Sequence, residues 1–120
     1  MSRTPSGADS NAGIDLEQNS KDLKIGKDIY VRILSKAMDQ TKQDIQELEA
    51  ALPVENFDLI QAISHRWKGD YDNMRIVTLS SVAKEMNEIV RSSQDKERIV
   101  VLLDDFRSAF AKLQEVIARS

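Results

Sequence analysis

The chain contains no cysteine, and this absence removes several kinds of chemistry together. Disulfide bridges, thiolate zinc sites and thiol nucleophiles all need that side chain. The sequence also has only one histidine, so a zinc site would need an unusual set of ligands. We therefore expect no metal site, and the redox environment stays open.

Long hydrophobic runs and an excess of basic residues are missing as well. No apolar run is long enough to span a bilayer, and the first residues lack the apolar core of a secretory signal. The formal net charge is -3, whereas nucleic-acid-binding domains are typically basic. The sequence predicts a cytoplasmic protein that binds neither membranes nor nucleic acids.

Motifs of independent enzymes are absent too. The sequence has no nucleophile elbow, no phosphate-cradling glycine loop and no Walker motif. Asp104 and Asp105 are adjacent, so on a helix they project about 100° apart and cannot converge on one substrate. An independent hydrolase or ATP-dependent kinase is not expected.

What the sequence does contain is apolar residues at helical spacing. A hydrophobic content of 41% over 120 residues is enough for one compact domain. The spacing predicts long helices over about 27–52, 57–72, 76–90 and 94 to the C-terminus, with a short helical turn within 14–23. Because the connections are short, the expected fold is an all-α, antiparallel up-down-up-down four-helix bundle. No strand pattern competes.

Several residues are predicted to limit these helices. Pro53 ends the first long helix, because a proline inside a helix removes a donor and clashes with the preceding turn. A break is expected near Asn73. The pair Ser92-Ser93 is typical of an N-cap and is predicted to start the last helix.

A flexible tail is predicted before the domain. Residues 1–13 are rich in small and polar side chains, so they bury too little surface to offset the entropy of ordering. The domain is therefore expected to span 14–120. In its first long helix, Tyr30, Ile33 and Leu34 are among the apolar residues that recur at helical spacing.

The single histidine, His65, lies on the polar side of the second long helix. The apolar stripe of this helix comprises Phe57, Ile60, Ile63, Trp67, Tyr71 and Met74. At about 100° per residue, His65 lies roughly 180° from the centre of that stripe. The spacing predicts an imidazole that faces water, either as a functional group or as an idle surface residue.

The neighbours of His65 favour a functional group. Residues three and four apart share a helix face, which brings Gln61, Ala62, Lys68 and Gly69 to the histidine. A glycine inside a helix costs about 1 kcal/mol relative to alanine, and clearance for another protein is one reason to keep it. Lys68, expected to be exposed, places an ammonium where it stabilises a phosphoryl group on the ring.

The run His65-Arg66-Trp67-Lys68-Gly69 resembles the motif of the histidine phosphotransfer (HPt) domain, which is histidine, any residue, an apolar residue, lysine and glycine. The resemblance extends over about 14–113. It includes Asn73-Met74, the apolar positions Leu79, Ala83 and Met86, and upstream segments at Gly13-Ile14-Asp15 and Tyr30 to Leu34. Asp70 and Tyr71 stand where the family usually has small residues, and Arg75 stands where it commonly has glycine.

This resemblance implies a phosphoryl carrier of a two-component phosphorelay. His65 corresponds to the phosphorylated histidine and Lys68 to the phosphate-contacting lysine. Expected docking positions for the partner are Gln61, Ala62, Arg66 and Gly69. The implied partners are response-regulator receiver domains, or a sensor or hybrid histidine kinase. Mg²⁺ is expected on the receiver, and no cofactor on this chain.

Several alternatives stay open from the sequence. A helical adaptor that binds signalling partners through the same face, without being phosphorylated, has the same periodicity. The sequence also leaves open whether a chain that carries a phosphoryl group, but has no kinase or hydrolase machinery of its own, counts as an enzyme. The donor, the acceptor, the reacting nitrogen and the origin as a free protein or an excised domain are undetermined. A monomer is the simplest expectation.

Overall fold

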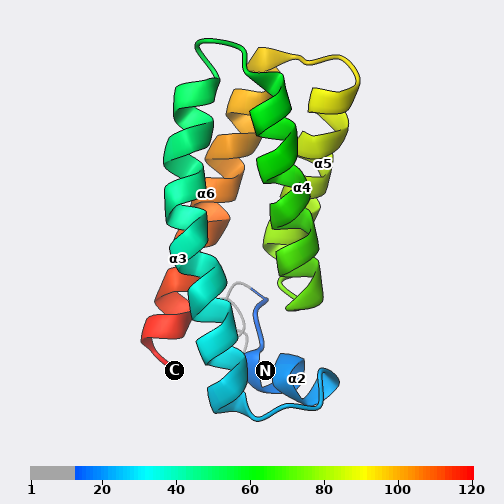
Figure 1. Cartoon of the computed structure of the whole chain (residues 1–120). Helices are drawn as coiled ribbons and strands as arrows, with labels where there is room; N and C mark the ends of the chain where they lie inside the picture. The colour runs from blue at the N-terminus through cyan, green and yellow to red at the C-terminus, as the bar shows by residue number, and fades with distance from the viewer. Residues whose placement is uncertain (1–12) are drawn as a thin grey trace, which may run out of the picture.

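The computed structural model describes residues 13–120, and this part of the chain is entirely helical. Its elements are α2 (Leu16–Asp22), α3 (Lys27–Ala51), α4 (Phe57–Asn73), α5 (Val77–Arg91) and α6 (Lys96–Ala118). The four long helices lie side by side, and the short α2 lies at the same end of the bundle as the C-terminus (Figure 1). Helix α4 packs against α3 and α5, α5 packs against α6, and α2 packs against α3.

The all-helical class and the five expected helical segments are confirmed for the described residues. Residues 1–12, which make up nearly all of the predicted flexible tail, lie outside them. Within the described range, no helix combines the length and apolar character needed to cross a membrane.

The ends of the helices agree with the sequence in one place and differ in another. Helix α3 ends before Pro53, as predicted. The prediction that Ser92-Ser93 caps the last helix is wrong, because α6 is capped by Asp95, whose carboxylate accepts a hydrogen bond from the Arg98 N–H at 3.2 Å. The physical reason is that Gln94, at φ 54°, donates its N–H to the Ile89 carbonyl and still belongs to the end of α5.

The turn between α4 and α5 contains a residue in the left-handed conformation. Arg75 has φ 64°, a left-handed conformation that glycine adopts at little cost and other residues adopt at a cost of about 1 kcal/mol. Neighbouring helices hold this turn in place. The Tyr30 hydroxyl donates to the Met74 carbonyl at 2.5 Å, and the Asn19 amide donates to the Arg75 carbonyl at 3.4 Å.

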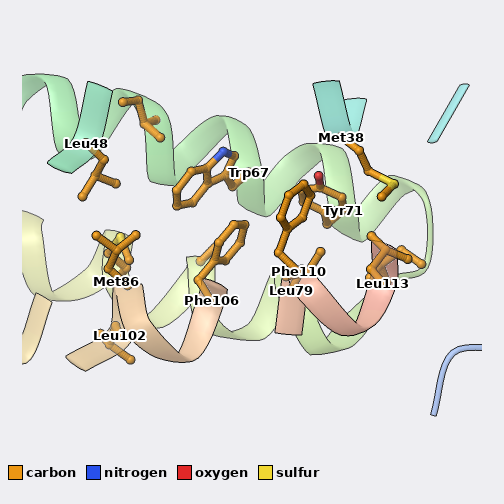
Figure 2. Packing of buried hydrophobic residues seen from close by; sticks show 14 of the residues in the cluster. Met38, Leu48, Trp67, Tyr71, Leu79, Met86, Leu102, Phe106, Phe110 and Leu113 are labelled. Carbon is orange, nitrogen blue, oxygen red and sulfur yellow. The ribbon is translucent and has the colours of Figure 1, made fainter. Parts of the chain in front are cut away.

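Aromatic side chains from α4 and α6 form the centre of the core. The ring of Trp67 faces that of Phe106 (Figure 2). The two rings are stacked, with centroids 3.9 Å apart and an interplanar angle of 8°. Tyr71 meets Phe106 edge to face, with ring centroids 6.2 Å apart. All three side chains are at most 1% exposed, so α6 supports α4 directly behind its exposed face.

One residue of the apolar pattern in α3 lies outside the core. Ile33 is 46% exposed, whereas Tyr30 and Leu34 are fully buried. Ile33 precedes Leu34 by one residue, so it lies about 100° around the helix from that buried side chain. Since Ile29 on the same side is also 50% exposed, this flank of α3 lies outside the bundle.

The two tyrosines provide a test of the core by pH. Burial raises the pKa of Tyr30 and of Tyr71, and these are the only tyrosines in the chain. A phenol whose pKa is raised by folding stabilises the native state fully below its unfolded pKa of about 10, and this stability is lost as the pH rises further. We therefore expect tyrosinate absorbance to appear together with loss of helical circular dichroism. Gradual ionisation near pH 10 in a fully helical protein would contradict this burial.

Candidate functional site

His65 lies in the middle of α4 and is exposed, as the sequence predicts. The side chains on the opposite side of the helix are buried, with Ile63 and Trp67 each 1% exposed. Ser64, directly before the histidine, is also fully buried, and its hydroxyl donates to the Gln61 carbonyl at 3.1 Å. The imidazole is therefore presented to solvent by a helix whose opposite side is held in the core.

A hollow of about 580 Å³ opens beside His65, between α4 and α5. Its lining residues are Asp58, Gln61, Ala62 and His65 from α4, and Asn87 and Arg91 from α5. The four positions on α4 are three, four and seven residues apart and so share one face of the helix. The structure thus brings the predicted docking residues Gln61 and Ala62 to His65 in one concave surface.

Three residues of this hollow, Asp58, Asn87 and Arg91, were not identified from the sequence. Asn87 is 2% exposed, and its amide nitrogen donates to the Gln61 carbonyl and to the Ser64 hydroxyl, both at 3.1 Å. Arg91 is exposed and has no ion-pair partner among residues 13–120. Asn87 therefore ties α5 to α4 beside the histidine, and Arg91 brings a second cation to it.

The sequence contains only part of the information that would place Asn87 and Arg91 beside His65. Asn87 and Arg91 are four residues apart and therefore share a face of α5. The pairing of α5 with α4 follows from their short connection, but the level at which the two helices face each other depends on packing.

Lys68 and Gly69 lie outside the hollow, one turn farther along α4. Lys68 is partly buried, which differs from the exposed side chain expected, and within the described chain it forms no ion pair. At Gly69, an added Cβ atom would meet no heavy atom within 4 Å. The interior of the protein therefore does not require a glycine there, and the space beside it is open.

Arg66 is already engaged within the protein. Its guanidinium donates to the Asp44 carboxylate at 2.6 Å, although the arginine side chain is 45% exposed. Asp70 lies one turn farther along α4; partial burial raises the pKa of its carboxyl, Arg66 lowers it, and Asp44 raises it. A partner that docks here meets Arg66 as part of this charged cluster.

Tyr71, which departs from the family's pattern, is a core residue. It is fully buried, and its hydroxyl forms a hydrogen bond of 2.6 Å with the Thr41 hydroxyl of α3. Its departure from a small residue therefore affects packing between α3 and α4 and does not alter the exposed face.

No cluster of three or more histidine, aspartate or glutamate side chains within residues 13–120 is arranged to hold a metal ion. The hollow combines the His65 imidazole, the Arg91 guanidinium and the Asp58 carboxylate, and Lys68 lies one turn farther along α4. Comparisons of the chain with protein-family models, with curated proteins and with solved structures find no match.

Proposed function

We propose that this protein is a histidine phosphotransfer protein of a two-component phosphorelay. It accepts a phosphoryl group on His65 from an aspartyl phosphate of a receiver domain, or from a histidine kinase, and passes it to another receiver. The observation that supports this most is the exposed His65 at a hollow that also contains Arg91, with Lys68 one turn away on the same helix.

The chemistry needs little beyond these groups. A neutral imidazole nitrogen is a nucleophile near pH 7, and phosphoryl transfer depends mainly on alignment and on neutralising charge. As the nitrogen–phosphorus bond forms, the phosphorus–oxygen bond to the aspartate breaks and the carboxylate leaves with the electron pair. Lys68 and Arg91 would neutralise the phosphoryl oxygens, and Mg²⁺ would be held by the receiver.

The fold proposed for this function is an antiparallel up-down-up-down bundle spanning residues 14–120. Its support is that consecutive long helices are joined by short connections and pack against each other. We propose further that the protein is cytoplasmic. We also propose that it acts as a monomer, because one copy contains all the groups that this chain would contribute to the reaction.

Transfer from phosphorylated receivers tests this function. Each purified receiver from the same genome is labelled with phosphate and incubated with the protein. We expect at least one receiver to transfer label to the protein in an acid-labile, base-stable form, as expected for phosphohistidine. Stable binding of receivers without any label on the protein would contradict phosphotransfer and support the adaptor instead.

A substitution at Gly69 should affect the stability of the fold and the docking of a partner in opposite directions. Gly69→Ala should raise the free energy of unfolding by about 0.5–1 kcal/mol, because alanine favours the helix and its Cβ enters open space. The same change should slow receiver-dependent transfer, because the methyl group narrows the surface that a receiver approaches. Urea denaturation and transfer kinetics measure the two effects.

The matched control for this change is Gly26→Ala. Gly26 precedes α3, and an added Cβ atom there also meets nothing within 4 Å. We expect this variant to transfer phosphate at the unaltered rate. Equal rates for Gly69→Ala and the unaltered protein would show that the open space beside Gly69 plays no part in docking.

A further inference from the structure

Asp44 of α3 is a buried carboxylate directed at α4. It is 1% exposed and accepts three hydrogen bonds from side chains. Its Oδ1 atom accepts from Arg66 Nη2 at 2.6 Å and from Gln40 Nε2 at 3.0 Å. Its Oδ2 atom accepts from the Trp67 indole nitrogen at 3.0 Å. Burying a charge is costly unless it is paired in this way, so the position of the carboxylate is well determined.

The two residues of α4 that Asp44 holds are the two that directly follow His65. Consecutive residues project about 100° apart around a helix, so Arg66 and Trp67 reach Asp44 from adjacent directions. A rotation of α4 about its axis would lengthen at least one of these bonds. The other side of Trp67 is closed by its stack on Phe106. Asp44 therefore opposes any rotation that would redirect the imidazole.

We infer that Asp44 is a positioning residue for phosphotransfer, setting through Arg66 and Trp67 the direction in which α4 presents His65. This inference rests on the proposed function. Asp44 and Trp67 are each 1% exposed, so they cannot contact a docked receiver themselves, whereas Arg66 is 45% exposed and can. Trp67→Phe keeps the Arg66–Asp44 pair, so it separates the positioning of α4 from docking through Arg66. A misplacement of about 1 Å in a reacting group lowers a rate by up to about 100-fold, so a small rotation of α4 is sufficient to matter.

The test compares Asp44→Asn with a matched variant between the same two helices. Thr41→Val removes the buried hydrogen bond from α3 to Tyr71, six residues beyond His65. Phosphoramidate, a small phosphodonor, labels an exposed imidazole without a docked protein, whereas a phosphorylated receiver requires the correct orientation. The single tryptophan and single histidine give unambiguous NMR signals for the indole N–H and the imidazole ring.

We expect Asp44→Asn to slow receiver-dependent transfer by about 10- to 100-fold and to leave labelling by phosphoramidate unchanged. The indole N–H and imidazole signals should shift in this variant, whereas the imidazole signal and transfer rate of Thr41→Val should stay as in the unaltered protein. Trp67→Phe removes the indole N–H but keeps an aromatic ring against Phe106. This variant should also slow transfer. The double variant Asp44→Asn/Trp67→Phe should slow it by a factor smaller than the product of the factors for the two single variants.

Two results would overturn the role of Asp44. One is an Asp44→Asn or Trp67→Phe variant that transfers phosphate at the unaltered rate with an unshifted imidazole signal. The other is an equal slowing by Thr41→Val, which would mean that any loss of contact between α3 and α4 has this effect. If Asp44→Asn does not fold, Trp67→Phe alone decides. Absence of label on the unaltered protein would instead overturn the proposed function, and this inference with it.

Discussion

His65→Gln is expected to abolish acid-labile phosphorylation of the protein completely while leaving its stability nearly unchanged. The side-chain amide of glutamine has no nucleophilic nitrogen, so no phosphoramidate bond can form at residue 65. The imidazole is exposed and no hydrogen bond to another residue is seen for it within residues 13–120, so the free energy of unfolding should change by no more than about 0.5 kcal/mol. Transfer assays with a labelled receiver and urea denaturation measure the two quantities.

The composition of the chain makes this result decisive. His65 is the only histidine, so phosphohistidine can form at no other residue. Acid-labile, base-stable label that persists in the variant would place the phosphoryl group elsewhere and contradict the site. Receiver binding by the variant should remain, because the groups of the hollow other than the imidazole are unchanged.

Lys68→Ala and Arg91→Ala are each expected to lower the rate of transfer, and together to lower it further. A hydrogen bond to a charged group contributes about 1.5–3 kcal/mol, which corresponds to about 10- to 100-fold in rate when the bond is made only in the transition state. Arg91 is exposed and Lys68 only partly buried, so we expect about tenfold for each and a larger loss for the double variant. Single-turnover transfer from a labelled receiver measures the rates.

Lys112→Ala on α6 is the control for the general effect of removing one positive charge from the surface. Lys112 is exposed and lines a different hollow, with Thr78 and Asp105, on the side of the bundle formed by α5 and α6. It should not change the rate of transfer. If Arg91→Ala behaves as Lys112→Ala does, then Arg91 does not contact the phosphoryl group and the hollow beside His65 serves another purpose.

Periodicity was sufficient to predict the helices, because an amphipathic helix records in its own residues which face is buried. The apolar stripe from Phe57 to Met74 placed α4 to within about one residue, and Pro53 marked the end of α3 correctly. Periodicity was less reliable where burial depends on a neighbour. Ile33 has helical spacing with the core residues, yet it is exposed because none of the helices described in residues 13–120 covers that flank of α3.

The start of α6 was predicted wrongly because two possible N-cap signals lie close together in the sequence. Ser92-Ser93 and Asp95 are both typical capping residues, and the choice between them depended on where α5 ends. Gln94 takes the left-handed conformation that closes α5, so α6 begins only after Asp95. Such a conformation in a residue other than glycine has no clear signature in one sequence.

For the site, the sequence alone determined the outward direction of His65 and the set of neighbours that it has on its own helix, because both follow from the geometry of a single helix. Only the tertiary structure decided what lies across from it. Asn87 and Arg91 reach the hollow from α5, and Asp44 holds α4 from α3. Contacts between helices depend on how their side chains interdigitate, and that packing involves residues far apart in the chain.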